Sequence, residues 1–173
     1  MAKDHLKRLA APKTWPVDRK HRTFITRPKP GRPFELALPL NQVMKRLLRK
    51  GTTTKEVKHI LQHDEVLVNG KRVHTHRRPV GFMDVVSFPS IGEQYVIGLD
   101  KQGRLTAVEV DKQQASQRIV KIRGKTRAAG KTQINCYDGT NVLVEKDSYH
   151  TGDSIVIKDG VVDKHLPLSE GAT

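Results

Sequence analysis

An Asn-Gly pair between two short β-prone runs is the feature that most limits how this chain can fold. Residues 66–68 (Val-Leu-Val) precede Asn69 and Gly70, and residues 71–73 (Lys-Arg-Val) follow them. A two-residue type I′ turn needs positive φ at both central positions, and Asn and Gly adopt positive φ most readily. The sequence therefore predicts a tight antiparallel hairpin. Residues 85–88 (Val-Val-Ser-Phe) supply a further strand that can close the small sheet.

A short helix is expected between Pro39 and Gly51, upstream of the hairpin. Proline suits the first helical position, and glycine suits the residue just past the end. The apolar residues between them recur at the spacing of one helix face and are Leu40, Val43, Met44, Leu47 and Leu48. At 100° per residue, the opposite face receives the cations Lys45, Arg46, Arg49 and Lys50.

A second helix is expected to begin with a capping box at Thr53. The Thr53 hydroxyl can accept a hydrogen bond from the backbone N–H of Glu56, while the Glu56 carboxylate reaches back. The apolar stripe that follows consists of Val57, Ile60 and Leu61. Lys55 and Lys58 remain at the edge of this helix, close to an N-terminus whose free N–H groups favour a phosphate.

The outward positions of both helices and the hairpin are almost purely basic. A charged solvent face is normal for an amphipathic helix, but ordinary solvated faces mix both signs. Glu56 is the only acid among outward positions that otherwise hold Lys45, Arg46, Arg49, Lys50, Lys55, Lys58, Lys71 and Arg72. Arg77 and Arg78 continue the basic run. We interpret this face as an RNA-binding surface.

The formal net charge of +14 indicates a polyanionic partner. Residues 1–34 carry ten Lys or Arg against two acids, residues 35–90 carry ten against five, and residues 91–173 carry twelve against eleven. The excess positive charge therefore lies in the first half of the chain.

The basic N-terminal extension, residues 1–34, is rich in proline and poor in apolar residues. We expect it to be disordered until RNA neutralises it, because it cannot bury enough surface to offset its ordering entropy. A solubilising tail is the simpler alternative, but cations with an interspersed aromatic residue suit phosphate contact and base stacking better. The RNA-binding residues predicted here are His5, Lys7, Arg8, Lys13, Trp15, Arg19, Lys20 and Arg22.

Alternating β-prone runs predict a small, mostly antiparallel β domain over residues 91–173. A hairpin is expected over 95–99 and 105–110, a brief helix from Asp111, and strands over 133–137, 142–145, 154–158 and 161–166. Within residues 119–127, four cations are expected on one side of a strand, namely Lys121, Arg123, Lys125 and Arg127. They either face RNA or guard an exposed edge against pairing with another sheet.

No pattern for catalysis, a cofactor or a small-molecule substrate is found in the sequence. Gly-x-Gly-x-x-Gly and Walker loops are absent, and no serine has a nucleophile-elbow context. His59 and His63 have a metal-chelating spacing, but no glutamate of a zinc-protease motif or nearby cysteine completes a ligand set. We therefore expect surface or RNA-contacting histidines and no metal. The single cysteine, Cys136, is expected to be a small core residue in a strand.

The chain lacks an apolar run of the length that a membrane span needs, and charged residues interrupt any signal-peptide pattern near its start. We therefore predict a cytoplasmic protein with no membrane partner.

The helix, capped helix, hairpin and late strand together resemble the RNA-binding module of the universal ribosomal protein four and some pseudouridine synthases. That module usually has Gly-Asp before its last strand, whereas residues 81–84 here are Gly-Phe-Met-Asp. This departure and the opening run of residues 5–13 with Trp15 resemble small-subunit ribosomal protein four of the archaeal and eukaryotic "e" type. The resemblance covers nearly the whole chain. In that family a KOW-type barrel generally follows, and this sequence stops at residue 173, about where the barrel should begin, so we expect either a shortened chain or a version without that third domain.

The resulting expectation is an α+β protein with a basic extended tail (1–34), a two-helix plus hairpin RNA-binding module (35–90) and a β-rich domain (91–173). The resemblance implies a structural, non-catalytic protein of the small ribosomal subunit, with small-subunit rRNA and neighbouring ribosomal proteins as partners. Two alternatives remain open. One is a free RNA-binding chaperone or quality-control factor, and the other is the RNA-binding part of an RNA-modifying enzyme.

Overall fold

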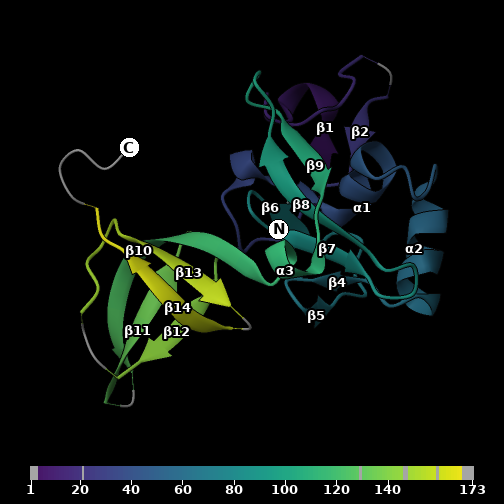
Figure 1. The fold of residues 1–173 in the computed structure, drawn as a ribbon. Coiled ribbons are helices and arrows are strands. Elements are labelled where there is room, and N and C mark those ends of the chain that lie inside the picture. Colours follow the sequence, from purple (N-terminus) through teal and green to yellow (C-terminus); the bar gives the residue numbers. More distant parts are fainter. Residues whose placement is uncertain (1–3, 21, 129, 146–147, 159, 169–173) are drawn as a thin grey trace. The chain divides into compact units, whose positions relative to one another are not determined.

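A computed structural model describes residues 4–20, 22–128, 130–145, 148–158 and 160–168 (Figure 1). Residues 1–3 and 21 of the predicted extension, and the gaps in the β-rich half, lie outside this description. The chain divides into two compact units, unit 1 (residues 1–111) and unit 2 (residues 112–173). The described residues form a few short helices and mostly antiparallel sheets, so the predicted α+β class is confirmed at this level.

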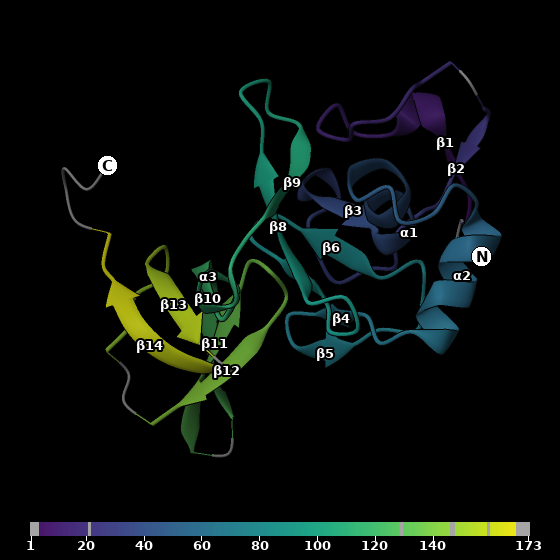
Figure 2. The same ribbon diagram turned by 45° about the vertical axis from the view of Figure 1, so that its right-hand side comes forward.

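The elements of unit 1 are β1 (Leu6–Lys7), η1 (Arg8–Ala10), β2 (Phe24–Ile25), η2 (Phe34–Leu36), β3 (Ala37–Pro39), α1 (Leu40–Gln42), η3 (Val43–Leu47), α2 (Thr54–His63), β4 (Leu67–Val68), β5 (Lys71–Arg72), β6 (Pro79–Gly81), β7 (Val85–Phe88), β8 (Glu93–Leu99) and β9 (Leu105–Glu109). The main sheet has the strand order β5-β4-β7-β8-β9, and β1-β2 and β3-β6 form separate pairs (Figure 2).

The predicted hairpin is present, with β4 and β5 paired across Asn69 and Gly70. Both turn residues have positive φ, 52° at Asn69 and 74° at Gly70, as a type I′ turn requires. Strand β7 pairs with β4 on the other side, so residues 85–88 do extend this sheet.

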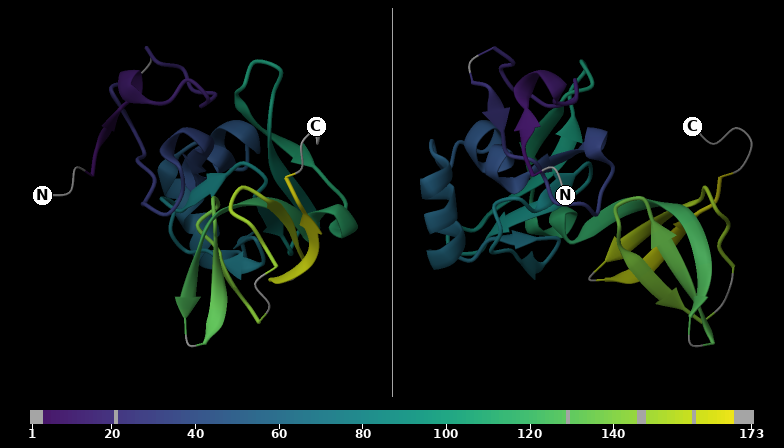
Figure 3. Two further views of the ribbon diagram at one scale, coloured as in Figure 1. Left: turned by 90° about the vertical axis from the view of Figure 1, so that its left-hand side faces the viewer. Right: turned by 180° about the vertical axis from the view of Figure 1, so that it is seen from behind.

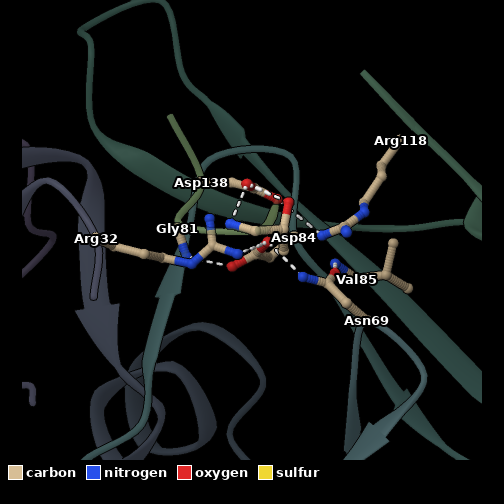
Figure 4. Close-up of polar contacts among 8 residues, drawn as sticks. Arg32, Asn69, Gly81, Asp84, Val85, Arg118 and Asp138 are labelled. Carbon is tan, nitrogen blue, oxygen red and sulfur yellow. Dashed lines mark hydrogen bonds and ion pairs between the residues drawn. The ribbon is translucent and has the colours of Figure 1, made fainter. Parts of the chain in front are cut away.

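Asp84 connects this turn to more distant parts of unit 1 (Figure 4). Its Oδ1 accepts hydrogen bonds from Asn69 Nδ2 at 2.7 Å and from Arg32 Nη2 at 2.6 Å. Its Oδ2 accepts from the backbone N–H of Gly81 at 2.7 Å. The Asp84 side chain is 1% exposed and that of Arg32 8% exposed, so this is a buried ion pair. One carboxylate thereby links the N-terminal segment, the hairpin turn and the end of β6.

The first predicted helix begins at Leu40, one residue after the expected Pro39, which caps it, and it departs from α-helical geometry after Gln42. Segment η3 is a π-helix, and the N–H of Leu48 reaches the carbonyl of Val43 at 3.0 Å. The helix ends at Leu47, so the prediction that Gly51 terminates it was wrong. Arg49 occupies the left-handed position instead, with φ of 53°.

The second helix, α2, confirms the predicted capping box. The Thr53 hydroxyl accepts from the Glu56 N–H at 3.2 Å, and the Glu56 carboxylate accepts from the backbone N–H groups of Thr52 and Thr53. Val57 and Leu61 are fully buried, and Ile60 packs partly buried against the same core, as the stripe predicted.

The Glu56 cap makes a testable prediction about pH. The N–H of Thr52 and the hydroxyls of Thr53 and Thr52 lower the Glu56 pKa to about 2. A carboxylate with a depressed folded-state pKa stabilises the fold above its ordinary pKa, and that contribution disappears as pH falls. We expect Glu56→Gln to destabilise unit 1 at pH 7. Urea unfolding followed by Trp15 fluorescence measures the difference in the free energy of unfolding between wild type and Glu56→Gln. This difference should disappear between about pH 4.5 and 2. A difference that persists below about pH 2 would show that it does not come from the Glu56 carboxylate.

The N-terminal segment is folded into unit 1, contrary to the expectation of disorder without RNA. Trp15 is only 2% exposed and belongs to the main core of this unit. The carbonyl of Thr14 accepts a hydrogen bond from the N–H of Leu105 at 2.8 Å, which ties the segment to strand β9. Trp15, together with Ile25 and Ala11, thus supplies burial that the composition of residues 1–34 did not suggest.

The boundary between the units also differs from the predicted one at residues 90 and 91. The hairpin of β8 and β9 is present as expected, but β8 pairs with β7 over four residue pairs. The hairpin therefore belongs to the sheet of unit 1, and the division falls after Asp111.

Unit 2 contains α3 (Lys112–Ala115), β10 (Gln117–Ala128), β11 (Lys131–Cys136), β12 (Asn141–Val144), β13 (Ser154–Lys158) and β14 (Val161–Leu166). These strands form a sheet of order β12-β11-β10-β13-β14, with β10 as a long curved strand (Figure 3). Its core includes Ile122, Ile134 and Ile155. Cys136 is 4% exposed in this core, as predicted, and burial raises the pKa of its thiol.

A β-bulge in β10 overturns the prediction that four cations share one side of this strand. The register shifts between Ile122 and Gly124, with Arg123 as the inserted residue. Before the bulge, Lys121 lies opposite Ser154 on the outer face; after it, Lys125 lies opposite the buried Ile134. Arg127 follows on the same face as Lys125, opposite Thr132. Because one extra residue reverses the alternation, Lys121 and Lys125 point to opposite faces.

Candidate nucleic-acid interface

A groove of about 620 Å³ on unit 1 gathers cations from distant parts of the sequence. Its lining consists of Arg8, Asp18, Arg22, Gln42, Lys45, Arg46, Arg49, Gly51 and Thr52. All five Lys and Arg in this set were predicted RNA-binding residues. The groove is therefore where the structure brings the extension and the first helix together.

Three segments of backbone place these cations. Arg8 stands at the start of η1, and Arg22 precedes strand β2 (Figure 2). Lys45 and Arg46 project from the π-helical turn η3, whose apolar side buries Val43 and Met44 in the core. Because that side is fixed by packing, the polar side of the turn is held toward the groove. π-helical turns are frequent at functional sites.

The cations of the groove act on one another electrostatically. Burial, followed by the charges of Arg22, Arg46 and Arg8, lowers the pKa of Lys45. Asp18 offsets part of this charge through an ion pair with Arg46 at 2.8 Å, and its backbone carbonyl accepts from Arg8 Nη1 at 2.6 Å. A concave surface lined mainly by one sign of charge concentrates oppositely charged ligands. The groove is thus suited to phosphate groups.

Replacing Arg49 with glycine is expected to have opposite effects on the stability of the fold and on RNA binding. A non-glycine residue in the left-handed region costs roughly 1–2 kcal/mol, and glycine in a folded chain costs about 0.5–1 kcal/mol of extra entropy. We therefore expect Arg49→Gly to raise the free energy of unfolding by about 0.5–1 kcal/mol while weakening RNA binding.

Arg49→Ala is the matched control for this prediction, because it removes the same charge but keeps the strained β-carbon. It should weaken RNA binding equally without stabilising the fold. Urea unfolding and fluorescence anisotropy with labelled RNA measure the two quantities. Equal stability of the glycine and alanine variants would contradict the assignment of strain at this position.

The other predicted cations of the module lie outside the groove lining. Lys55 and Lys58 are exposed on α2, and Lys71 and Arg72 are exposed on the hairpin. In the extension, His5, Lys7, Lys13 and Lys20 are also exposed. These side chains are free to contact RNA from solvent but are not preorganised by the groove. In unit 2, Lys121 and Arg123 are exposed on β10.

Several predicted contact residues have structural partners instead. Trp15 is buried and offers no open ring face for stacking. Arg19 donates to the carbonyls of Leu9 at 3.2 Å and Pro12 at 3.0 Å. Arg77 binds Asp4 at 3.0 Å and the carbonyl of Arg27 at 3.1 Å. These bonds hold the N-terminal segment in its fold, whereas Arg78 is exposed in the connection before β6.

Lys50 also departs from its predicted position. It forms an ion pair with Glu93 at 2.5 Å, and its Nζ lies 5.9 Å from the centre of the Phe88 ring. The helical periodicity that grouped Lys50 with Lys45 and Arg46 fails because the helix has already ended at Leu47.

Four residues of the groove lining were not predicted, namely Asp18, Gln42, Gly51 and Thr52. Gln42 is 4% exposed in the first helix, and Asp18 lies between the basic positions of the extension. Both were missed because the prediction was based on positive charge, and Gln42 is neutral and Asp18 is acidic. An acid within a basic run, such as Asp18, does indicate a local ion pair.

His59 and His63 stand side by side on α2, with ring centroids 4.1 Å apart. Across the part of the chain that the structure describes, no three His, Cys, Asp or Glu side chains are grouped to hold a metal ion. Likewise, none of the described helices combines the length and apolar character needed to cross a membrane.

Comparison with known proteins finds two family models that match parts of this chain. Residues 91–159 match the model of the ribosomal family S4e, and residues 2–32 match the RS4NT domain. The small ribosomal subunit protein eS4 of Halorubrum lacusprofundi is 40% identical over 172 residues, covering 97% of this chain and 72% of that protein. The eS4 protein of Methanospirillum hungatei is 38% identical, covering 96% of this chain and 71% of its own length.

The fold has a solved relative as well. The crystal structure of 30S ribosomal protein S4e from Thermoplasma acidophilum is similar with a TM-score of 0.60 and 28% identity. The similarity covers 77% of this chain and 69% of that one. Given this agreement of sequence and fold over most of its length, the chain belongs to the ribosomal S4e family.

Proposed function

We propose that this chain is a non-catalytic structural constituent of the small ribosomal subunit that binds and stabilises small-subunit rRNA. The observation that carries the proposal is the groove in which Arg8, Arg22, Lys45, Arg46 and Arg49 converge. Its relatives are named as proteins of the small ribosomal subunit, which supports small-subunit rRNA as the polyanion that the groove binds. These names give no support to the chaperone or the RNA-modifying enzyme as alternatives.

The mechanism is electrostatic and geometric. Backbone phosphates enter the groove, while exposed cations on α2, the hairpin and the N-terminal segment add contacts around it. In this proposal, unit 1 is an RNA-binding module of the ribosomal-protein-four type, extended by the N-terminal segment and the hairpin of β8 and β9. Recognition depends on RNA shape and backbone more than on base edges, because an A-form helix hides its deep groove.

Two measurements test the proposal. In sucrose gradients of ribosomes from the native source, the chain should remain at one copy per small subunit after a high-salt wash. The purified chain should bind small-subunit rRNA fragments with an affinity that falls roughly a thousandfold or more between 50 and 200 mM salt if about six to ten phosphates are engaged. Release of the chain into the soluble fraction, or binding that is flat in salt, would contradict it.

A further inference from the structure

The aromatic residue that faces solvent beside the groove is Phe24 and not Trp15. Phe24 is 57% exposed, compared with 43% for Phe82, 39% for Phe34 and 3% for Phe88. An apolar ring in so exposed a position costs hydration free energy unless something covers it in the functional state. Phe24 is therefore the most exposed of the four phenylalanines in this chain.

The pairing of β1 with β2 explains why this ring points outward. Leu6 lies opposite Ile25, and Lys7 lies opposite Phe24. Because opposed residues in an antiparallel pair share a face, the burial of Ile25 leaves Lys7 and Phe24 together on the outer face. His5 packs against Phe24 in a T-shaped arrangement, with ring centroids 6.0 Å apart and planes at 89°. The ring is thus held in place by one neighbour and flanked by a cation.

The same two strands join this ring to the groove. Arg22 precedes Phe24 by two residues, and Arg8 directly follows Lys7. Both arginines line the groove. An extended chain rises about 3.3 Å per residue, so the Phe24 backbone lies within about 7 Å of that of Arg22. This is the scale of a single nucleotide.

We propose that Phe24, supported by His5, is a stacking platform for the base of an unpaired nucleotide whose backbone phosphates occupy the groove. The inference rests on the proposed RNA-binding function and adds its ligand class, single-stranded or bulged RNA next to a helix. Positive charge that follows the backbone, combined with an aromatic face for a base, is the usual arrangement of single-strand sites. Lys7 is placed to contact the phosphate on the far side of the stacked nucleotide.

The test compares Phe24→Leu with Phe82→Leu, a matched control that removes an exposed phenylalanine from the connection between β6 and β7. The probes are a 12-nucleotide single-stranded RNA carrying one 2-aminopurine and a blunt RNA duplex. We expect Phe24→Leu to weaken binding of the single strand about 5- to 150-fold. Its salt slope and its affinity for the duplex should not change. Phe24→Trp should bind the single strand about as well as wild type does, because it keeps an aromatic ring. Phe82→Leu should change the affinity for the single strand less than about twofold.

Two outcomes separate this proposal from the one on which it rests. If wild-type protein binds both RNAs with steep salt dependence but Phe24→Leu binds the single strand equally well, the stacking proposal is wrong and the RNA-binding function stands. If wild-type protein binds neither RNA, the RNA-binding function itself fails. Quenching of 2-aminopurine by wild-type protein, lost in Phe24→Leu, supports stacking directly, and far-UV circular dichroism verifies that each variant is folded.

Discussion

Replacing Asp84 with alanine is expected to lower the free energy of unfolding of unit 1 by about 3–5 kcal/mol. The change removes the acceptor for Arg32, Asn69 and the N–H of Gly81 at once. Breaking a buried ion pair is costly because a charge that was desolvated on folding loses the favourable interaction with the opposite charge at 2.6 Å. The Asn69 amide and the Gly81 N–H would also lose their carboxylate acceptor, and each unsatisfied buried donor adds to the cost.

Trp15 makes this measurement specific to unit 1. It is the only tryptophan in the chain, and it lies in the core of that unit. Urea unfolding followed by its fluorescence should show the midpoint of Asp84→Ala well below that of wild type. Asp64→Ala is the control, because Asp64 is an exposed acid of the same unit and should cost no more than about 0.5 kcal/mol. Similar losses for both variants would mean that the buried network does not stabilise the fold.

Removal of three groove cations should have the largest effect on RNA binding. We expect the triple variant Lys45→Gln, Arg46→Gln and Arg49→Gln to weaken binding of small-subunit rRNA about a hundredfold or more near 100 mM salt. It should also reduce the slope of log affinity against log salt by about 2 to 3. The reason is that binding through fewer phosphate contacts releases fewer counterions from the RNA. Lys50 is left unchanged, since its ion pair with Glu93 contributes to the fold.

A charge-matched control distinguishes the groove from general electrostatics. Lys101, Arg104 and Lys112 are exposed and do not line the groove, and changing all three to Gln removes the same net charge. This second triple variant should bind RNA within about threefold of wild type, with a nearly unchanged salt slope. If both triple variants lose affinity equally, the groove is not the principal site of phosphate contact. Fluorescence anisotropy over a salt series measures both quantities.

Local sequence signals predicted the local structure of this chain well. The Asn69-Gly70 turn, the Thr53 capping box and the strands over 154–158 and 161–166 all depend on interactions within a few residues. Such features are set by backbone preferences and short-range hydrogen bonds, which the sequence displays directly.

The features that the sequence did not predict depend on distant contacts or on a single inserted residue. Trp15 is buried because strand β9 and Phe34 meet it in space, not because its neighbours are apolar. The bulge at Arg123 reverses which face of the sheet the later side chains of β10 point to. The regular alternation of residues along this strand does not indicate a bulge. The π-helical turn moved the left-handed position from the expected glycine to Arg49.

The candidate site was predicted in its composition but not in its geometry. The cations of the extension and of the first helix were both identified from charge, yet their convergence on one groove needs the fold of residues 4–32 against unit 1. The sequence likewise did not predict that Phe24 is exposed and Trp15 buried, since both aromatic residues lie in stretches of similar composition.

The hydrogen bond between Thr14 and Leu105 also constrains the order in which this protein can fold during its own synthesis. The N-terminal segment leaves the translating ribosome before strand β9, so its tryptophan has no complete pocket until that strand has emerged. Contacts between parts so far apart in sequence slow folding, because a long loop must close before they form. Until strand β9 has emerged, therefore, the nascent chain carries an unfolded cationic segment, which the last strand of unit 1 then draws into the native core.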